Sequence, residues 1–230
     1  METWTSLKNQ SFQDWEWIVV PNNGAKVDAI ADARVRIVPL DICVENIGSL
    51  KRFACRQAKG DVLFELDHDD ILMPAALEEC AAAFQDPEVV LAYSNCVEFH
   101  HDTWQPHTFG LQYGWRYRPF SYQGHKLQEA VAFETTPHSQ GKIYWAPNHF
   151  RAWRRSAYEE VGGHDPNMKV FDDHDLMCRL YLKGKFKHIN EPLYLYRVHG
   201  KNTWLERNQA IQDATHEVYA KYIYQLVEKW

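Results

Sequence analysis

Short apolar runs alternate with segments of helical spacing along the first part of the chain. β-Branched and aromatic residues are concentrated in four runs that predict strands: 15–20, 35–38, 61–66 and 89–93. Between these runs, residues 49–58 and 75–84 place apolar side chains at helical intervals. Strands that alternate with helices need crossover connections. The pattern therefore predicts an α/β fold, with a mainly parallel, mixed sheet flanked by helices.

The pattern changes at Cys96. From there to Phe150 the chain is rich in His, Trp, Tyr, Gly and Pro with little periodicity, which is typical of a long functional loop. Beyond it the sequence predicts five short elements: a strand at 151–155, helices at 156–161 and 172–182, and strands at 186–189 and 193–198. Residues 203–230 carry an apolar stripe and predict a helix that packs on the domain, with a partner-binding helix as the alternative.

Composition narrows the function classes. The 230 residues are 45% hydrophobic and 24% charged, as in globular proteins. The 31 acidic and 25 basic residues give a net charge of −6, which disfavours binding to nucleic acid. Nine Trp and 12 Tyr indicate either aromatic pocket walls or a Trp-rich core.

The five cysteines and the hydropathy of the chain bear on its location. The cysteines are odd in number and lack a Cys-x-x-Cys pair, so we expect reduced, mostly buried thiols in a cytoplasmic protein. The sequence shows no signal-peptide pattern, and no apolar segment approaches the ~20 residues of a membrane span.

Three carboxylates within four residues follow the buried strand that ends at Leu66. Asp67, Asp69 and Asp70 repel one another, and a divalent cation such as Mg²⁺ or Mn²⁺ would remove that conflict. Such an ion commonly bridges the phosphates of a substrate. The alternative is that Asp69 and Asp70 only favour the start of the next helix.

A second acidic cluster, Asp172-Asp173-His174-Asp175, lies at the start of a predicted helix. Asp172 and Asp173 are candidates for catalysis, but Asp is also favoured at helix N-termini for capping. His199 follows a predicted strand and precedes a glycine, so by itself it fits a surface histidine as well as a ligand.

Taken in order, six blocks of this sequence resemble the family 2 glycosyltransferases of the GT-A fold. Leu66-Asp67-His68-Asp69-Asp70 resembles the family's LDxDD segment, which contains the DxD motif, and Asp172-Asp173 resembles its (E/D)D pair. The other blocks are similar to family segments at residues 9–20, 46–52, 154–165 and 197–202. His164 stands where the family usually has Phe. The resemblance covers nearly the whole chain outside the aromatic stretch from 96 to 150.

The resemblance implies a role for each matching residue. Asp67 would contact the ribose or diphosphate and the metal ion, Asp69 and His199 would ligate Mn²⁺ or Mg²⁺, and Asp173, preceded by Asp172, would be the catalytic base of an inverting, metal-dependent transfer. The donor would be a nucleotide-diphosphate sugar, with a UDP-sugar favoured. Further donor contacts would come from four residues: Asn22, Asn23, Lys51 and Arg52.

The acceptor side is less well defined by the resemblance. Trp145, His149 and Arg155 are candidates to bind a glycan, lipid-linked or small-molecule acceptor, and Trp104 and Trp115 to stack on a sugar, with plain packing as the alternative. A homodimer is compatible with these expectations. We expect residues 1–230 to form one GT-A domain, with a nucleotide-binding half (1–95), an acceptor-binding and catalytic half (96–202) and a C-terminal helix (203–230).

Two departures from the family pattern accompany the resemblance. The family's first strand and half of its first helix have no counterpart before Met1, so we expect an N-terminally truncated version of the fold. The family's VDDGS loop is Val20-Pro21-Asn22-Asn23-Gly24 here, which keeps hydrogen-bonding capacity but loses negative charge. A degenerate, non-catalytic sugar- or partner-binding relative is therefore an alternative. A phosphohydrolase or nucleotidyltransferase using the same carboxylates is a third.

Overall fold

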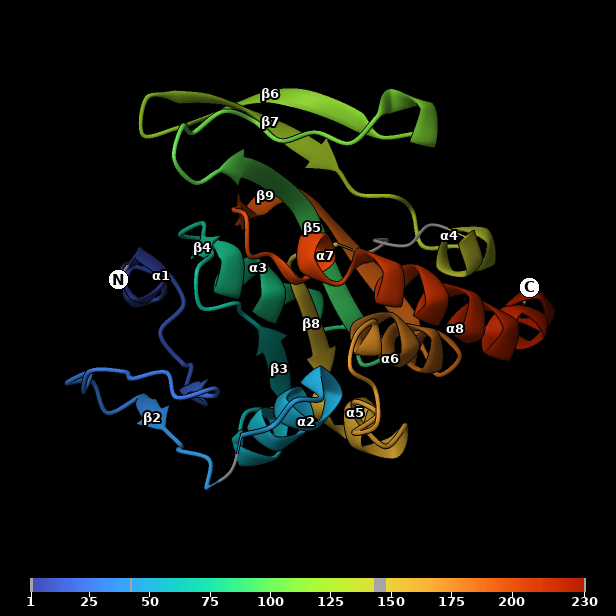
Figure 1. The fold of residues 1–230 in the computed structure, drawn as a ribbon, viewed down its shortest axis with the longest axis horizontal. Helices are drawn as coiled ribbons and strands as arrows, with labels where there is room; N and C mark the ends of the chain where they lie inside the picture. The colour runs from blue at the N-terminus through green and yellow to red at the C-terminus, as the bar shows by residue number, and fades with distance from the viewer. Residues whose placement is uncertain (1, 42, 143–147, 230) are drawn as a thin grey trace.

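The computed structural model describes residues 2–41, 43–142 and 148–229. Its N-terminal part contains the short helix α1 (Glu2–Lys8) and a small sheet of two parallel strands, β1 (Trp17–Val19) and β2 (Val35–Ile37) (Figure 1). The β-branched and aromatic residues of both runs form strands where the sequence predicts them, although each strand is shorter than its run.

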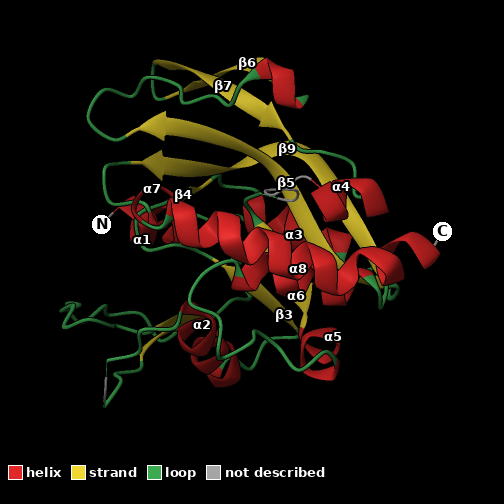
Figure 2. Ribbon diagram, turned by 45° about the vertical axis from the view of Figure 1, so that its right-hand side comes forward, coloured by secondary structure: helices red, strands yellow, loops and turns green. Residues whose placement is uncertain are grey.

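A seven-stranded sheet forms the centre of the molecule. Five strands follow one another in the order β3-β8-β5-β7-β6, and β9 pairs with both β5 and β4. The strands are β3 (Val62–Glu65), β4 (Ile71–Leu72), β5 (Val89–His100), β6 (Arg116–Tyr122), β7 (His125–Val131), β8 (Arg151–Arg154) and β9 (Lys185–Val198). Figure 2 shows β5 and β9 as the long strands of this sheet, and their pairing is parallel.

Helices cover both faces of the sheet. Successive residues of β5 and β8 belong to different core clusters: Ala92 and Ala152 pack with α1 and α3, whereas Leu91 and Trp153 pack with α5 and α6. This alternation is the two-residue period of a strand. The helices are α2 (Ile47–Gln57), α3 (Ala76–Ala83), α4 (Pro137–Lys142), α5 (Arg155–Glu160), α6 (Asp172–Tyr181), α7 (Thr203–Glu206) and α8 (Asn208–Glu228), with a 3₁₀ turn at Leu111–Tyr113.

The predicted α/β fold with a mixed, helix-flanked sheet is confirmed, but its sheet is less parallel than the pattern indicates. Only β5–β9 and β1–β2 pair in parallel, while five pairings of the large sheet are antiparallel: β3–β8, β4–β9, β5–β7, β5–β8 and β6–β7. The difference arises because the stretch expected to be a loop contributes the β6–β7 hairpin, which forms one end of the molecule in both ribbon views. β8 also inserts between β3 and β5.

The C-terminal segment packs on the domain, as its apolar stripe predicts, but it is broken at Arg207 into α7 and α8. Val218, Tyr222 and Leu226 of α8 form a core cluster with Cys178 of α6. The hydroxyl of Tyr222 also donates a hydrogen bond to Asp175 of α6, at 2.8 Å. This contact anchors α8 on the helix that begins with Asp172 and Asp173.

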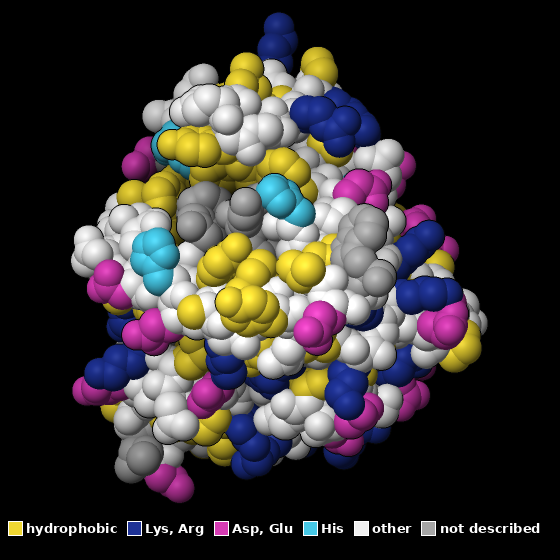
Figure 3. All heavy atoms as spheres, turned by 90° about the vertical axis from the view of Figure 1, so that its right-hand side faces the viewer, with side chains coloured by type: hydrophobic (Ala, Val, Ile, Leu, Met, Phe, Trp, Pro, Cys, Tyr) yellow, Lys and Arg dark blue, Asp and Glu magenta, His cyan; other side chains and the backbone are white. Residues whose placement is uncertain are grey.

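Most of the cysteines are buried, as the sequence predicts, and one is exposed. Cys80, Cys96 and Cys178 are buried and no described cysteine is in a disulfide, whereas Cys43 is exposed. Lys and Arg side chains lie among Asp and Glu side chains on the face in Figure 3, so this face carries mixed charge. None of the helices in the described ranges combines the length and the apolar character needed to cross a bilayer.

Two tyrosines of α8 provide a matched test of this packing. Tyr222 is 4% exposed and Tyr224 is 81% exposed. We expect Tyr222→Ala to lower the free energy of unfolding by about 3–5 kcal/mol, because it removes a buried ring and a hydrogen bond to Asp175. Tyr224→Ala should change it by less than about 0.5 kcal/mol. Urea unfolding measures both, and equal effects would contradict the packing described here.

Candidate active site

A cavity of about 610 Å³ lies where the carboxyl ends of β1, β3, β5 and β9 meet the start of α6. Ligands bind at this edge of α/β sheets. Side chains from α2, β8 and α7 complete its wall. Five residues singled out from the sequence line it: Lys51, Asp67, His149, Asp172 and Asp173.

A buried ion network forms one wall of the cavity. Arg151 of β8 contacts Glu65 of β3 at 3.0 Å and Asp173 at 2.6 Å, and its side chain is 6% exposed. Lys51 of α2 pairs with the same Glu65 and lies 3.9 Å from Asp172. Three carboxylates therefore share two cations, which leaves one negative charge without a partner.

The two aspartates at the start of α6 respond differently to this network. Burial disfavours the charge of Asp173, but Arg151 and Lys51 outweigh burial and hold the pKa of Asp173 well below its usual value. Asp172 is the more deeply buried of the two. Burial, reinforced by the charges of Asp173 and Glu65 and opposed by Lys51, raises the pKa of Asp172 to about 7. Of the two aspartates, Asp172 is thus the one that holds a proton more readily.

His164 lies behind Asp172. Its Nε2 is 3.6 Å from Asp172 Oδ2, and neither of these buried atoms has another hydrogen-bond partner. The opposite nitrogen, Nδ1, is 3.0 Å from the hydroxyl of Tyr158. Burial lowers the pKa of His164 to about 3, so the ring is neutral. The sequence marked this position as a departure from the family pattern, and the structure places it against Asp172.

The three carboxylates of the acidic loop after β3 have different surroundings. Asp70 is buried and accepts hydrogen bonds from the Tyr194 hydroxyl and the Arg197 backbone N–H, both at 2.8 Å, so it holds the loop. Asp67 lines the cavity, and burial together with the charge of Glu65 raises its pKa to about 6. Asp69 lies 2.7 Å from Nε2 of His199.

Asp69 of this loop and His199, which follows β9, form the pair of side chains that suits a divalent cation. Within the described ranges, no group of three His, Cys, Asp or Glu side chains is arranged to hold an ion. Two donors are nevertheless enough for an ion that completes its shell with water and substrate phosphates. The facing carboxylate oxygen and imidazole nitrogen of this pair fit that arrangement.

Several residues predicted to contact the donor lie outside the cavity. Asn22 hydrogen-bonds both backbone groups of Val44, which joins two loops, and Asn23 is exposed and accepts from Cys43. Arg52 donates to the backbone carbonyl of His164.

The predicted acceptor residues are similarly divided. His149 lines the cavity, with its ring stacked on Tyr194 and Tyr196, and burial lowers its pKa to about 3. Arg155 lies at the opposite end of β8 from Arg151 and pairs with Asp61 at 3.6 Å. Trp145 falls outside the described residues.

The other tryptophans singled out from the sequence pack in the structure. Trp115 is buried against Phe109 and Phe133, and Trp104 stacks on Phe99. The plain packing interpretation therefore applies to both. Two residues that the sequence analysis did not single out, Glu98 and Trp204, line the cavity instead. Their separation along the chain left no local pattern by which to find them.

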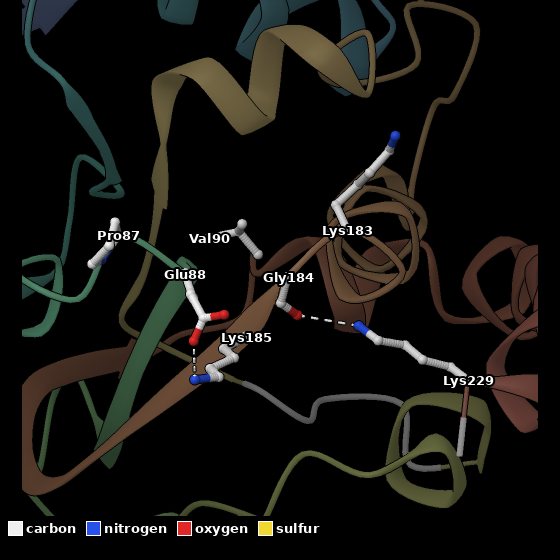
Figure 4. A pocket seen from close by; sticks show the side chains of 7 residues that line it. All are labelled: Pro87, Glu88, Val90, Lys183, Gly184, Lys185 and Lys229. Carbon is white, nitrogen blue, oxygen red and sulfur yellow. Dashed lines mark hydrogen bonds and ion pairs between the residues drawn. The ribbon is translucent and has the colours of Figure 1, made fainter.

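A second, smaller depression of about 390 Å³ lies at the amino ends of β5 and β9, away from the acidic loop (Figure 4). Each of its three lysines already forms an ion pair or a hydrogen bond within the protein. Lys185 pairs with Glu88, Lys183 with Glu160, and Lys229 donates to backbone carbonyls, including that of Gly184. The larger cavity is therefore the one with catalytic potential.

Comparisons with known proteins agree with this geometry. The family model for glycosyl transferase family 2 matches residues 1–162. The chain is 28% identical over 173 residues to a hyaluronan synthase of Pasteurella multocida, covering 75% of this chain and 16% of that protein. It is 27% identical over 164 residues to a chondroitin synthase of Escherichia coli, covering 71% and 21%. The chain thus spans about a fifth or less of the length of these relatives.

Solved structures show the same fold. The S. aureus TarS fragment 1–349 in complex with UDP superposes with a TM-score of 0.60 at 15% identity, over 96% of this chain and 66% of that one. The complex of the same fragment with UDP-GlcNAc also gives a TM-score of 0.60, over 87% and 55%. With a family match over more than half of its residues, this chain belongs to glycosyl transferase family 2.

Proposed function

We propose that this chain binds a UDP-sugar and transfers its sugar, with inversion and with the help of a divalent cation, to a hydroxyl group of a glycan acceptor. The observation that carries the proposal is that one cavity gathers Lys51, Asp67, Arg151 and Asp173 from four separate segments of the fold. Family membership, the UDP-bound TarS neighbours and the polysaccharide synthases among the relatives support it.

Asp173 is the carboxylate suited to take the acceptor proton. Its side chain is 26% exposed, whereas that of Asp172 is 3% exposed. Its Oδ2 accepts from Arg151 and its Oδ1 from the His174 backbone N–H, which leaves a lone pair on each oxygen. Arg151 keeps this carboxylate ionised, so proton transfer is favourable only as the attacking hydroxyl becomes acidic.

The reaction is a single displacement at the anomeric carbon. The acceptor oxygen bonds to that carbon, the bond to the diphosphate oxygen breaks with its electron pair staying on the diphosphate, and the hydroxyl proton passes to Asp173. Inversion follows from this one-step geometry. A cation held by Asp69 and His199 would neutralise charge on the leaving diphosphate.

The first prediction concerns the base. Asp173→Asn should lower kcat about 10²–10⁴-fold, because the amide cannot accept the proton, while UDP affinity stays unchanged. Sugar transfer is followed by UDP release, and UDP binding by calorimetry. Asp213→Asn, on the exposed side of α8, is the matched control. Turnover that survives Asp173→Asn would exclude this base, and folded protein that binds no UDP would exclude the function.

The second prediction concerns the cation. UDP should bind about tenfold or more tightly with Mn²⁺ than with EDTA, and Asp69→Asn should abolish that difference because one of its two ligands is lost. Asp102→Asn, at a carboxylate with a 92% exposed side chain, is the control. Equal affinities with and without Mn²⁺ would show that the cation plays no part in binding.

The third prediction concerns the protonated aspartate. The folded protein holds the Asp172 proton more tightly than the unfolded chain, so this group stabilises the fold most below pH 4. That contribution is lost as the pH rises to about 7. Its full size is about 4 kcal/mol, since a difference of one in pKa corresponds to about 1.4 kcal/mol. Asp67 and Asp70, whose pKa values are also raised, act in the same direction, and the lowered pKa values of three buried histidines, His149, His164 and His174, act in the opposite one.

Urea unfolding at pH 4 to 8 measures this dependence. The free energy of unfolding of wild type minus that of Asp172→Asn should decrease as the pH rises from 4 to 8, because the amide does not titrate, whereas the same difference for Asp213→Asn should stay constant. An equal pH dependence in wild type and Asp172→Asn would assign the proton to another group.

A further inference from the structure

The cavity has a second end that the donor chemistry leaves unused. Glu98 of β5, Asn148 and Trp204 of α7 line it, and Asn148 contacts Glu98 while His107 contacts both Glu98 and Trp204. The stretch from Asn148 to Arg151 connects this end to the base, since Asn148 contacts Glu98 and Arg151 contacts Asp173. A molecule bound at this end and extending along that stretch would reach Asp173.

Glu98 is a buried carboxylate whose orientation is fixed. Its side chain is 4% exposed, yet it reaches the cavity wall. Asn148 Nδ2 donates to Oε1 and His107 Nδ1 lies 2.8 Å from Oε2, while the His107 backbone N–H donates to the Glu98 carbonyl. Each carboxylate oxygen keeps acceptor capacity, so the group is prepared to accept hydrogen bonds from ligand hydroxyls.

The ion-pair partner of this carboxylate is the imidazole of His107, and neither a lysine nor an arginine among the described residues pairs with it. By contrast, Glu65 beside the base pairs with Lys51 and Arg151. Because no Lys or Arg pairs with Glu98 to bind a ligand carboxylate, this carboxylate favours ligands that donate hydroxyl hydrogen bonds over anionic ones. This end of the cavity therefore discriminates by charge.

Trp204 supplies an apolar face next to this carboxylate. Its ring is partly buried and packs on His107, with ring centroids 5.7 Å apart. The same His107 thus contacts both the carboxylate and the indole. An aromatic face beside a fixed hydrogen-bond acceptor matches a pyranose, which has an apolar C–H face and a rim of hydroxyls.

We propose that Glu98, held by His107 and Asn148, and Trp204 form an acceptor subsite for an uncharged pyranose, a neutral hexose or N-acetylhexosamine rather than a uronic acid. The inference rests on the proposed function, because it places the acceptor hydroxyl at Asp173. Glu98 and Trp204 are specificity-determining residues in this scheme, and His107 is a positioning residue that orients both.

The test measures binding of three probes to the full chain in the presence of UDP and Mn²⁺. These are methyl β-glucopyranoside, methyl β-N-acetylglucosaminide and methyl β-glucuronide, each titrated by saturation-transfer NMR. Wild type should bind at least one neutral glycoside about tenfold or more tightly than the glucuronide. Glu98→Gln should weaken binding of the neutral glycoside about tenfold and bring the ratio between the two close to one.

Two further variants separate the subsite from general structural damage. Trp204→Ala should weaken both neutral glycosides, and Trp204→Phe should restore part of the affinity because it keeps an aromatic face. Glu129→Gln alters another buried glutamate of the same sheet, outside the cavity, and should bind all three probes as wild type does.

UDP affinity, measured on each variant, separates the two proposals. If UDP binds but no glycoside does, if the glucuronide binds as tightly as the neutral probes, or if Glu98→Gln changes nothing, the subsite is overturned. If UDP does not bind while the glycosides still depend on Glu98 and Trp204, the proposed function fails and the subsite stands.

Discussion

The contact between Arg151 and Glu65 is the interaction on which the site depends. The two residues are direct partners in the antiparallel ladder of β3 and β8, so the register of that ladder places the guanidinium beside the carboxylate. A shift of one residue would turn Arg151 to the other face of the sheet. From this position Arg151 also reaches Asp173 at the start of α6. The strand pairing, rather than any loop, therefore sets where the proposed base lies.

The same network explains why two adjacent aspartates differ. Arg151 and Lys51 cannot neutralise Glu65, Asp172 and Asp173 together, and the uncompensated charge falls on the carboxyl group that is least accessible to solvent. Burial disfavours the ionised form of Asp172 and raises its pKa to about 7, whereas Arg151 and Lys51 keep Asp173 ionised. Neutral His164 lies against Asp172 and adds no positive charge that would drive the proton off. The helix thus presents one charged and one protonated carboxyl group to adjoining regions of the cavity.

Sequence patterns predicted the parts of this protein that depend on local chemistry. The strand at β3 and the acidic loop after it follow from an apolar run and the residues that end it, and the structure places Asp67 at the cavity as that order suggests. Pairings between distant segments were not predictable in this way. The hairpin β6–β7 alternates only weakly between buried and exposed residues, so its two-residue period was not recognised. Glu98 and Trp204 line the same cavity because β5, β9 and α7 converge there, and this cannot be seen from either segment alone. Trp115 was a candidate sugar-binding residue because it is a tryptophan, but its side chain is buried in the core.

The segment that leads from β9 to α7 carries His199, which contacts Asp69, and Trp204, which lines the cavity. Asn202 accepts a hydrogen bond from the His199 backbone N–H and donates to the Tyr196 hydroxyl and the Arg197 carbonyl, so one buried amide fixes the turn between them. His199 on one side of this turn faces Asp69, and Trp204 on the other side lines the proposed acceptor subsite. Both side chains are therefore carried by one short turn, whose conformation is set by the hydrogen bonds of Asn202. The positions of the proposed cation ligand and of the proposed acceptor subsite thus depend on the same buried amide.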